Sequence, residues 1–490
     1  MGFVNATYEL GKMYIRKGDD SDFGDIDPFL QLPMLVIDDD SRSGRVIRVW
    51  LDVEDKNAET LVVRGISRID LTDFIRDSDS EKLSEEKRKY LYREPTGSAT
   101  PWKYSPIYKL GKGSASALNE LIGEDMQWKE NSKTRFYKLN RTVLKEFENC
   151  KVFSEGSTDI VMDRLEEHIG QLAEIWNDKN RSYIMVFGVA DGTNFNYPGM
   201  IPAFRDYFKS KLSQNTGGDV PIVCSLCHCN AESGANLDKI FKFATFDKSN
   251  FLPGIAENKG VPEKVFPICE ECLSYLSLGR NILDRSFLDT RTVPGVRIYA
   301  VPELIFGQEF LGKASLKTQD FIKTGLKTSE RFFHILAKQE NSLVYHFLFW
   351  EKNQAQERLH LMVEDVPPSR LKYIEQLWRE TYKVFLWNEK QDPDLDFNTI
   401  TLDIALKTLY STLISLSGKN ENDQKIVRDM VIGIIGRLLD SEKINVDRLK
   451  QFMVSRFPGL FADPDWIRFG GYNLRKMAAV SEFLQKANRR

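Results

Sequence analysis

Two pairs of cysteines in this chain have the spacing of a metal site. Cys224 and Cys227 form one C-x2-C pair, and Cys269 and Cys272 form a second. Two such pairs can supply four thiolates to one tetrahedral zinc ion. Four thiolates fill every position around the ion, whereas a catalytic zinc usually keeps one position open. The sequence therefore predicts zinc as a structural cofactor, with no catalytic role for the metal.

The exact ligand set has alternatives. His228 and Cys229 directly follow Cys227, and either could replace it, although a position outside the coordination sphere is favoured for both. Four unrelated buried thiols are a further alternative, which the matched spacing in a chain of six cysteines disfavours. The 41 residues between the pairs exceed the usual spacing of a zinc ribbon. The site is therefore expected at the base of an inserted lobe.

Two turn-rich segments carry residues that could contact DNA. In residues 102–114, lysines alternate with aromatic residues and glycines, so that charge, freed backbone amides and rings could meet phosphates and bases. An ordinary ordered loop would contain the same residues. In the loop 191–199, the side-chain amides of two asparagines could pair with adenine. The candidate DNA-binding residues are Lys109, Gly111, Lys112, Gly113, Ser114, Asn194 and Asn196.

The motifs of common enzyme classes are absent from the sequence. It contains no Walker phosphate loop, no G-x-S-x-G elbow and no H-E-x-x-H helix. His346 and His360 fall inside apolar strand patterns, which favours core histidines. Gly217-Gly-Asp-Val220 resembles the GGDD turn of palm polymerases and cyclases, but a valine replaces the second carboxylate that two-metal chemistry needs. The sequence predicts a protein that is not an enzyme.

The elements around these residues predict an α+β protein. Apolar and alternating runs predict strands, several of them antiparallel, at 34–37, 45–51, 60–63, 182–190, 297–301, 342–350 and 358–363. Helical periodicity predicts helices at 6–15, 77–89, 160–176, 202–212, 371–386, 400–416, 423–439, 446–457 and 472–487. The prolines at 367 and 368 mark the start of the last five helices, because helical backbone is disfavoured before proline.

Four domains follow from this pattern. Residues 1–215 form a mixed N-terminal α+β region assigned to DNA motif recognition, and 216–285 form the inserted four-cysteine, zinc-binding lobe. Residues 286–368 return to the α+β core, and 369–490 form a C-terminal helical bundle. A chain of 490 residues exceeds the limit of one ordinary core, which agrees with several domains.

Composition limits the partners and the compartment. The chain has no uncharged apolar run of 18 residues and no signal-peptide pattern at its start, so a cytoplasmic protein without a membrane segment is expected. The net charge of −3 argues against coating of nucleic acid by bulk electrostatics. Residues 369–490 nevertheless carry an excess of basic side chains. Any nucleic-acid contact must therefore be local, or be shared with partner subunits.

Several segments of the chain stand out: Tyr8-Glu-Leu-Gly-Lys-Met-Tyr14, the two cysteine pairs, Phe243-Ala-Thr-Phe-Asp-Lys248 between them, and Val363-Glu-Asp-Val-Pro-Pro-Ser-Arg370. In this order they resemble one family, the large subunit of the type I-B CRISPR Cascade surveillance complex. The resemblance spans nearly the whole chain and also includes the C-terminal bundle. The cysteine pairs alone are unspecific, since polymerase-like subunits of type III systems carry them too.

The resemblance implies a non-catalytic subunit of an RNA-guided antiviral complex. Such a subunit recognises the protospacer-adjacent motif in duplex DNA, helps to open the strands, and guides the displaced single strand toward a helicase-nuclease. Its partners are a CRISPR RNA and repeated backbone subunits, and base pairing reads the target sequence. Two alternatives remain: a type III-like palm polymerase or cyclase subunit, and a zinc-stabilised protein scaffold that does not discriminate DNA.

The resemblance also implies a possible second product. In this family a small subunit can arise from an internal translation start, and Met362 lies just before the bundle. A product of residues 362–490 has 129 residues and contains all five predicted bundle helices. It could fold alone through local helix packing and line the path of single-stranded DNA. The alternative is that Met362 is simply a buried strand residue within 359–363.

Overall fold

The computed structural model divides the chain into two compact units. Unit 1 comprises residues 1–16, 240–245 and 275–490, and unit 2 comprises residues 17–239 and 246–274. No helix within the described ranges is both long and apolar enough to cross a membrane. The structure describes residues 2–14, 23, 26–33, 44–74, 80–93, 104–124, 127–213, 221–232, 234–244, 265–306, 314–326, 331–353, 356–390, 392–417, 420–462 and 464–489.

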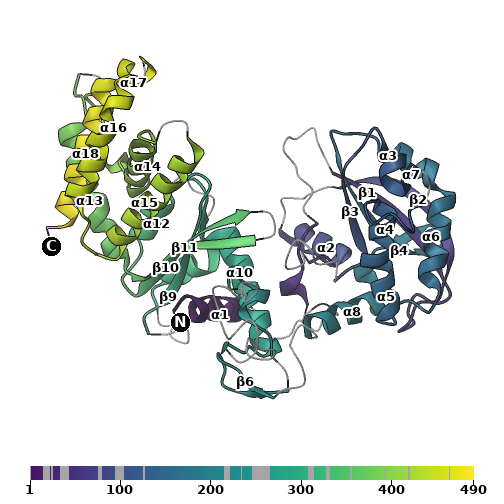
Figure 1. Ribbon diagram of the computed structural model, residues 1–490. Coiled ribbons are helices and arrows are strands. Elements are labelled where there is room, and N and C mark those ends of the chain that lie inside the picture. Colours follow the sequence, from purple (N-terminus) through teal and green to yellow (C-terminus); the bar gives the residue numbers. More distant parts are fainter. Residues whose placement is uncertain are drawn as a thin grey trace. The chain divides into compact units, whose positions relative to one another are not determined.

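Unit 2 is built on a mixed five-stranded sheet, visible in Figure 1. The order is β2-β1-β4-β3, and β5 pairs with β4. β1 runs parallel to β4, so the sheet is not wholly antiparallel. β4 is buried along almost its whole length, as its apolar run predicted. The strands are β1 (Gly44–Val53), β2 (Val63–Phe74), β3 (Ile107–Lys112), β4 (Ser182–Asp191) and β5 (Asn194–Asn196).

Short helices accompany this sheet, and α6 packs on β2. The single helix expected over 160–176 is two helices, because α6 ends and α7 begins at His168. The strand expected at 34–37 lies outside the described residues. The helices are α2 (Ser80–Tyr90), α3 (Ala117–Ile122), α4 (Arg135–Leu139), α5 (Lys145–Asn149), α6 (Ser157–Glu167), α7 (Ile169–Ile175) and α8 (Pro202–Ser213), with the π-helical turn Asn140–Leu144.

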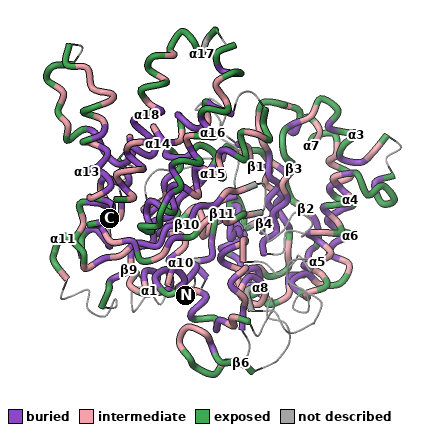
Figure 2. Tube along the Cα trace, turned by 60° about the vertical axis from the view of Figure 1, so that its left-hand side comes forward, coloured by how far each residue is buried: buried purple, intermediate pink, exposed green. Residues whose placement is uncertain are grey.

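Unit 1 contains a four-stranded antiparallel sheet and the helix α1 (Gly2–Tyr14). Its strand order is β11-β10-β9-β8, and the buried central strands β9 and β10 are purple in Figure 2. The strands are β8 (Leu288–Asp289), β9 (Arg297–Leu304), β10 (Leu343–Asn353) and β11 (Gln356–Val366).

Helix α1 lies directly against α10 (Glu270–Ser286), and two glycines permit the contact. A methyl group on Gly11 would lie 1.8 Å from the carbonyl oxygen of Tyr275. A methyl group on Gly279 would lie 2.0 Å from the carbonyl oxygen of Thr7. Any larger side chain would therefore separate the two backbones. The glycine in the Tyr8–Tyr14 segment is explained by this close approach.

The C-terminal helices form a bundle, as the periodicity predicted, and α13 starts at Pro368. The prolines thus define the boundary, since proline suits the first helical position. Trp378 and Phe483 meet edge to face in the core, with ring centroids 5.3 Å apart. The bundle helices are α13 (Pro368–Phe385), α14 (Leu402–Ile414), α15 (Glu421–Leu439), α16 (Val446–Leu460), α17 (Pro464–Arg468) and α18 (Gly470–Ala487). Two helices precede β10, namely α11 (Leu316–Thr324) and α12 (Phe332–Ala337).

A buried carboxylate fastens α12 to the bundle. The two oxygens of Asp403, on α14, accept hydrogen bonds from the backbone amides of Phe333 and His334 at 2.9 and 3.0 Å. These amides belong to the first turn of α12, where helical N–H groups have no partner within the helix. The Asp403 side chain therefore caps a helix that precedes it by 70 residues. This cap is a long-range contact that joins the sheet region to the bundle.

The stability of unit 1 should depend on the protonation of Asp403. Burial raises the pKa of this carboxyl to about 6, against the lowering effect of its two backbone hydrogen bonds. The folded protein then holds a proton that the unfolded chain releases near pH 4, so the contribution of Asp403 to stability falls as pH rises from 4 to 6. Between pH 4.5 and 7 the loss should be about 2 kcal/mol. Denaturant unfolding of the wild type and of Asp403→Asn at both pH values measures this difference, and identical pH dependence in the two proteins would contradict it.

Candidate metal centre

The first cysteine pair sits in a tight hairpin turn. β6 (Ile222–Val223) and β7 (Asn230–Ala231) are antiparallel, and Cys224 and Cys227 lie in the turn between them. The amide of Cys224 donates to the carbonyl oxygen of Cys229 at 3.0 Å, and the amide of His228 donates to the carbonyl oxygen of Cys224 at 3.0 Å. These bonds close the turn, with His228 in left-handed backbone conformation. Both thiols of the first pair therefore come from one rigid turn.

The second pair is positioned by the start of α10. Cys269 precedes the helix and Cys272 lies in its first turn. Ile268 and Ala235 exchange backbone hydrogen bonds of 2.7 and 2.9 Å, and the amide of Ser225 donates to the carbonyl oxygen of Pro267 at 2.8 Å. Backbone hydrogen bonds therefore hold the two cysteine pairs against each other.

The four sulfur atoms have the separation that a zinc ion requires. One ligand sulfur from each of Cys224, Cys227, Cys269 and Cys272 lies within 4.8 Å of the others, and Cys227 Sγ is 3.7 Å from Cys269 Sγ. Tetrahedral Zn–S bonds of about 2.3 Å place sulfurs about 3.8 Å apart. A disulfide would need a separation near 2.05 Å. The cysteine cluster therefore fits a four-thiolate metal site.

The two alternative ligands lie outside this cluster. Cys229 is exposed, and its thiol donates to the carbonyl oxygen of Cys227 at a sulfur–oxygen distance of 3.7 Å. His228 is not among the residues whose donor atoms gather at the site. The four cysteines of the two C-x2-C pairs are the set that the structure brings together.

Burial makes two of the thiols, those of Cys269 and Cys272, reluctant to ionise without a cation. Cys224, Cys269 and Cys272 are buried, whereas Cys227 is half-buried. Burial raises the pKa of Cys269 to about 11 and raises that of Cys272 further. A hydrogen bond from the backbone amide of Cys229 lowers the pKa of Cys227 to about 7. A bound divalent cation would supply the charge that stabilises all four thiolates.

A second group of donors lies on the sheet of unit 1. Atoms of Glu303, His346 and Asp365 lie within 4.8 Å of one another. His346 is fully buried, its Nε2 is 2.5 Å from a Glu303 oxygen, and its Nδ1 accepts from the Asp365 amide at 3.4 Å. Both ring nitrogens are thus already hydrogen-bonded. His346 is the satisfied core histidine that the sequence predicted.

The lysine-rich candidate segment is a strand, not a loop. Lys109, Gly111 and Lys112 lie in β3, and the pairing of β3 with β4 is irregular between Lys109 and Gly111. Lys109 Nζ lies 5.1 Å from the centroid of the Tyr92 ring. The loop expectation was wrong because the glycine belongs to a bulge, where its positive φ of 83° is needed.

Two of the proposed phosphate-binding amides already have partners. The amide of Gly113 donates to the carbonyl oxygen of Arg181 at 3.0 Å, and that of Ser114 donates to the carbonyl oxygen of Trp176 at 3.0 Å. Lys112, by contrast, is exposed. Of this candidate set, the Lys112 side chain is the group best placed to meet a phosphate.

The asparagine candidates lie far from the lysine candidates. Asn194 and Asn196 are in β5, where Asn194 pairs with Asp191 at the end of β4. Lys112 pairs with Ser182 at the opposite end of β4. Nine residues of strand separate these pairings, or about 30 Å at the rise of an extended chain. The structure therefore does not bring the two candidate sets into one site.

The structure tests only part of three further sequence features: the segments 217–220 and 243–248, and Met362. Gly217–Val220 lies outside the described residues, as do the last four residues of the 243–248 segment. Met362 lies within β11 opposite Leu348, but it is 39% exposed, so its interpretation as a buried residue was wrong. A product that starts at Met362 would lack β8, β9, β10 and half of β11.

Two family models match this chain. A search of curated proteins finds no match. Residues 3–210 match the model of the CRISPR-associated protein TM1802 N-terminal domain, and residues 222–366 match that of the CRISPR-associated protein TM1802 central domain. The central-domain match contains both cysteine pairs. Since these matches cover most of the chain, the protein belongs to the CRISPR-associated TM1802 family.

Proposed function

We propose that this chain is the large subunit of a type I-B CRISPR complex that is guided by RNA. The observation that carries the proposal is the family match over residues 3–210 and 222–366. In this role the chain recognises the protospacer-adjacent motif in duplex DNA, aids strand opening and recruits a helicase-nuclease. It is a binding subunit, not an enzyme, and base pairing with the guide RNA selects the target.

Zinc is the proposed cofactor, held by Cys224, Cys227, Cys269 and Cys272. The sulfur separations support this assignment, as does the burial of three of the thiols. Four thiolates complete the coordination of the ion, so the metal would stabilise the fold of its surroundings and supply no reactive position.

Co-purification from the native host tests the proposed complex. The chain, tagged at one end, should bring down a CRISPR repeat-derived RNA and a subunit present in several copies. The purified assembly should bind duplex DNA with one short flanking motif more tightly than the same duplex with that motif scrambled. Recovery of the chain without RNA, or equal affinity for both duplexes, would contradict the proposal.

A phosphate contact at the end of β3 is the second expectation of this proposal. Lys109→Ala/Lys112→Ala should weaken binding of every duplex by a similar factor, roughly tenfold, and flatten the salt dependence of affinity, because phosphate contacts release counterions. Lys133→Ala/Lys138→Ala removes the same charge from two exposed lysines of unit 2 and serves as control. Unchanged affinity and salt slope in the first variant would exclude this surface.

Base reading by Asn194 and Asn196 makes a different prediction. Because amide side chains discriminate adenine, Asn194→Ala should relax the preference for the flanking motif and leave binding of scrambled duplex unchanged. Asn194 is exposed on the edge strand β5, so its replacement should not disturb the core. Competition between matched and scrambled duplexes measures the preference, and a retained preference would exclude Asn194.

The two alternatives fit the findings less well. The family match is to a CRISPR-associated protein, which favours a role in such a complex over a general zinc-stabilised scaffold. A palm polymerase or cyclase would need paired carboxylates at the 217–220 turn, where Val220 supplies none.

A further inference from the structure

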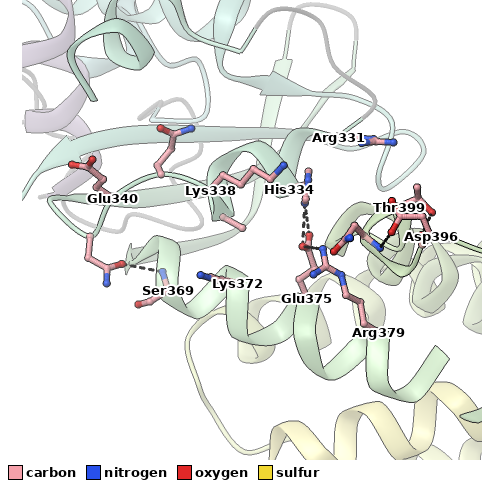
Figure 3. A pocket seen from close by; sticks show the side chains of 14 residues that line it. Arg331, His334, Lys338, Glu340, Ser369, Lys372, Glu375, Arg379, Asp396 and Thr399 are labelled. Carbon is pink, nitrogen blue, oxygen red and sulfur yellow. Dashed lines mark hydrogen bonds and ion pairs between the residues drawn. The ribbon is translucent and has the colours of Figure 1, made fainter. Parts of the chain in front are cut away.

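A polar cavity of about 720 Å³ lies within unit 1, beside α12 and α13 (Figure 3). This volume is in the range of pockets that hold small ligands. None of its residues belongs to the cysteine cluster or to the candidate DNA contacts. Its walls are formed by Arg331, His334, Ala337, Lys338, Gln339, Glu340, Asn341, Ser369, Lys372, Glu375, Arg379, Asp396, Asn398 and Thr399.

One wall carries a buried histidine held by a carboxylate. His334 Nδ1 lies 2.8 and 3.1 Å from the two oxygens of Glu375, and the two side chains are only 7% and 6% exposed. Glu375 also accepts hydrogen bonds from the Leu402 amide and from the guanidinium of Arg379. The Glu375 carboxylate is therefore bonded to three groups of the protein and holds each of them in place.

The second ring nitrogen of His334 has no partner in the described part of the chain. With the Nδ1–H bond directed to Glu375, the imidazole is fixed in one orientation and one tautomer. Nε2 then remains as the polar atom of a side chain that is more than nine-tenths buried and lines the cavity. This nitrogen is therefore available to a ligand that enters the cavity.

Two lysines at the cavity also lack an ion-pair partner among the described residues. Figure 3 shows no dashed line to Lys338 or Lys372, and within the described ranges neither ammonium group forms an ion pair. Lys338 follows His334 by four residues, and Lys372 precedes Glu375 by three, so each pair shares one face of its helix. The cavity thus gathers two unpaired cations around the histidine.

The lining carries four cationic side chains against three carboxylates, so positive charge is in excess; the cations are Arg331, Lys338, Lys372 and Arg379, and the carboxylates are Glu340, Glu375 and Asp396. Asp396 accepts from the amide of Asn398 at 2.9 Å, and Glu340 accepts from the hydroxyl of Thr318 at 3.4 Å. The cavity also lies at the start of α13, an 18-residue helix whose N-terminal end carries positive partial charge. Ser369, in the first turn of this helix, is part of the lining.

We propose that this cavity binds the phosphate group of a nucleotide or of a nucleic-acid backbone. Lys338 and Lys372 supply the charge, because lysine binds phosphate as a point charge on a flexible stem. His334 Nε2 completes the site by donating to a phosphate oxygen once the ring is protonated, or, for a phosphate monoester, by accepting from its protonated oxygen. This site is independent of the motif recognition proposed for unit 2.

Calorimetric titration of the full-length chain tests the site. The probes are adenosine 5′-monophosphate, adenosine, and a single-stranded DNA trinucleotide without terminal phosphates. At least one phosphate-bearing probe should bind tenfold more tightly than adenosine. Binding by the monophosphate alone identifies a free nucleotide as the ligand class, and binding by the trinucleotide identifies a nucleic-acid backbone.

Two double variants decide whether the cavity is responsible. Lys338→Ala/Lys372→Ala should lower the affinity for the phosphate-bearing probe at least tenfold. Because both lysines are exposed, the variant should keep the fold. Lys425→Ala/Lys443→Ala removes the same charge from exposed lysines that do not line the cavity, and its affinity should stay within twofold of wild type. The proposal is overturned if both double variants lose the same affinity for the phosphate-bearing probe. It is also overturned if the wild-type protein binds adenosine as tightly as it binds both phosphate-bearing probes.

Discussion

Replacing Cys272 with serine should reduce the zinc content from about one ion per chain to well under half. Cys272 is only 1% exposed, and the serine hydroxyl that would replace its thiol is a poor zinc ligand in a buried position. The binding free energy of structural zinc, about 10–16 kcal/mol in small zinc domains, is folding free energy. The segments around the cysteine pairs should therefore lose their order. Metal analysis of protein purified without chelator, together with limited proteolysis, measures both effects.

Cys229→Ser is the matched control for this experiment. Cys229 belongs to the same hairpin turn as Cys227, but it is exposed and outside the cysteine cluster. Its replacement should leave zinc content and protease resistance unchanged. If Cys229→Ser loses as much zinc as Cys272→Ser, the ligand set includes Cys229 and the assignment of Cys227 is wrong. Wild-type protein with well under one zinc per chain would refute the site itself.

The isolated segment 362–490 should not fold cooperatively, whereas the segment 331–490 should. The shorter segment lacks α12, whose Phe332, Phe333 and Leu336 are buried. Burial of three such side chains contributes about 5–9 kcal/mol, comparable with the whole stability of a typical domain. It also lacks Leu361, which lies against Gly436 of α15. Thermal unfolding followed by circular dichroism compares the two segments.

The helix cap of α12 supplies a control for the same comparison. Asp403→Leu should lower the melting temperature of 331–490, because two amides of α12 lose their acceptor. The same substitution should not destabilise 362–490, which has no α12 to cap. A cooperative transition of 362–490 near that of 331–490 would contradict the expected dependence on α12. An internal start at Met362 would then yield an independently folded product.

Local patterns in the sequence predicted the elements that local chemistry determines. The two C-x2-C pairs were recognisable because each occupies one turn, and the bundle was recognisable because its apolar residues recur at helical spacing. The start of α13 followed from the backbone restriction that proline imposes on its neighbour. These features depend on residues within a few positions of one another.

Contacts between distant residues could not be predicted in the same way. Nothing near Asp403 in the sequence indicates that its carboxylate caps α12, and the partnership of Glu375 with His334 spans 41 residues. The parallel pairing of β1 with β4 was missed because alternation within a strand does not reveal the direction of its neighbour. Gly111 was read as part of a loop, since a bulge and a turn require the same positive φ.

The packing of α1 on α10 has a consequence for synthesis of the chain. The residues of α10 that contact α1 follow it by roughly 260 positions, so on the ribosome they emerge long after α1 does. At about 5–20 residues per second, this delay is on the order of tens of seconds. During that time the face of α1 with Thr7, Tyr8 and Gly11 has no partner from α10 to cover it. Nascent chains of this length should therefore be bound by chaperones at α1, and release should follow the appearance of α10 and of β9, which also packs on α1.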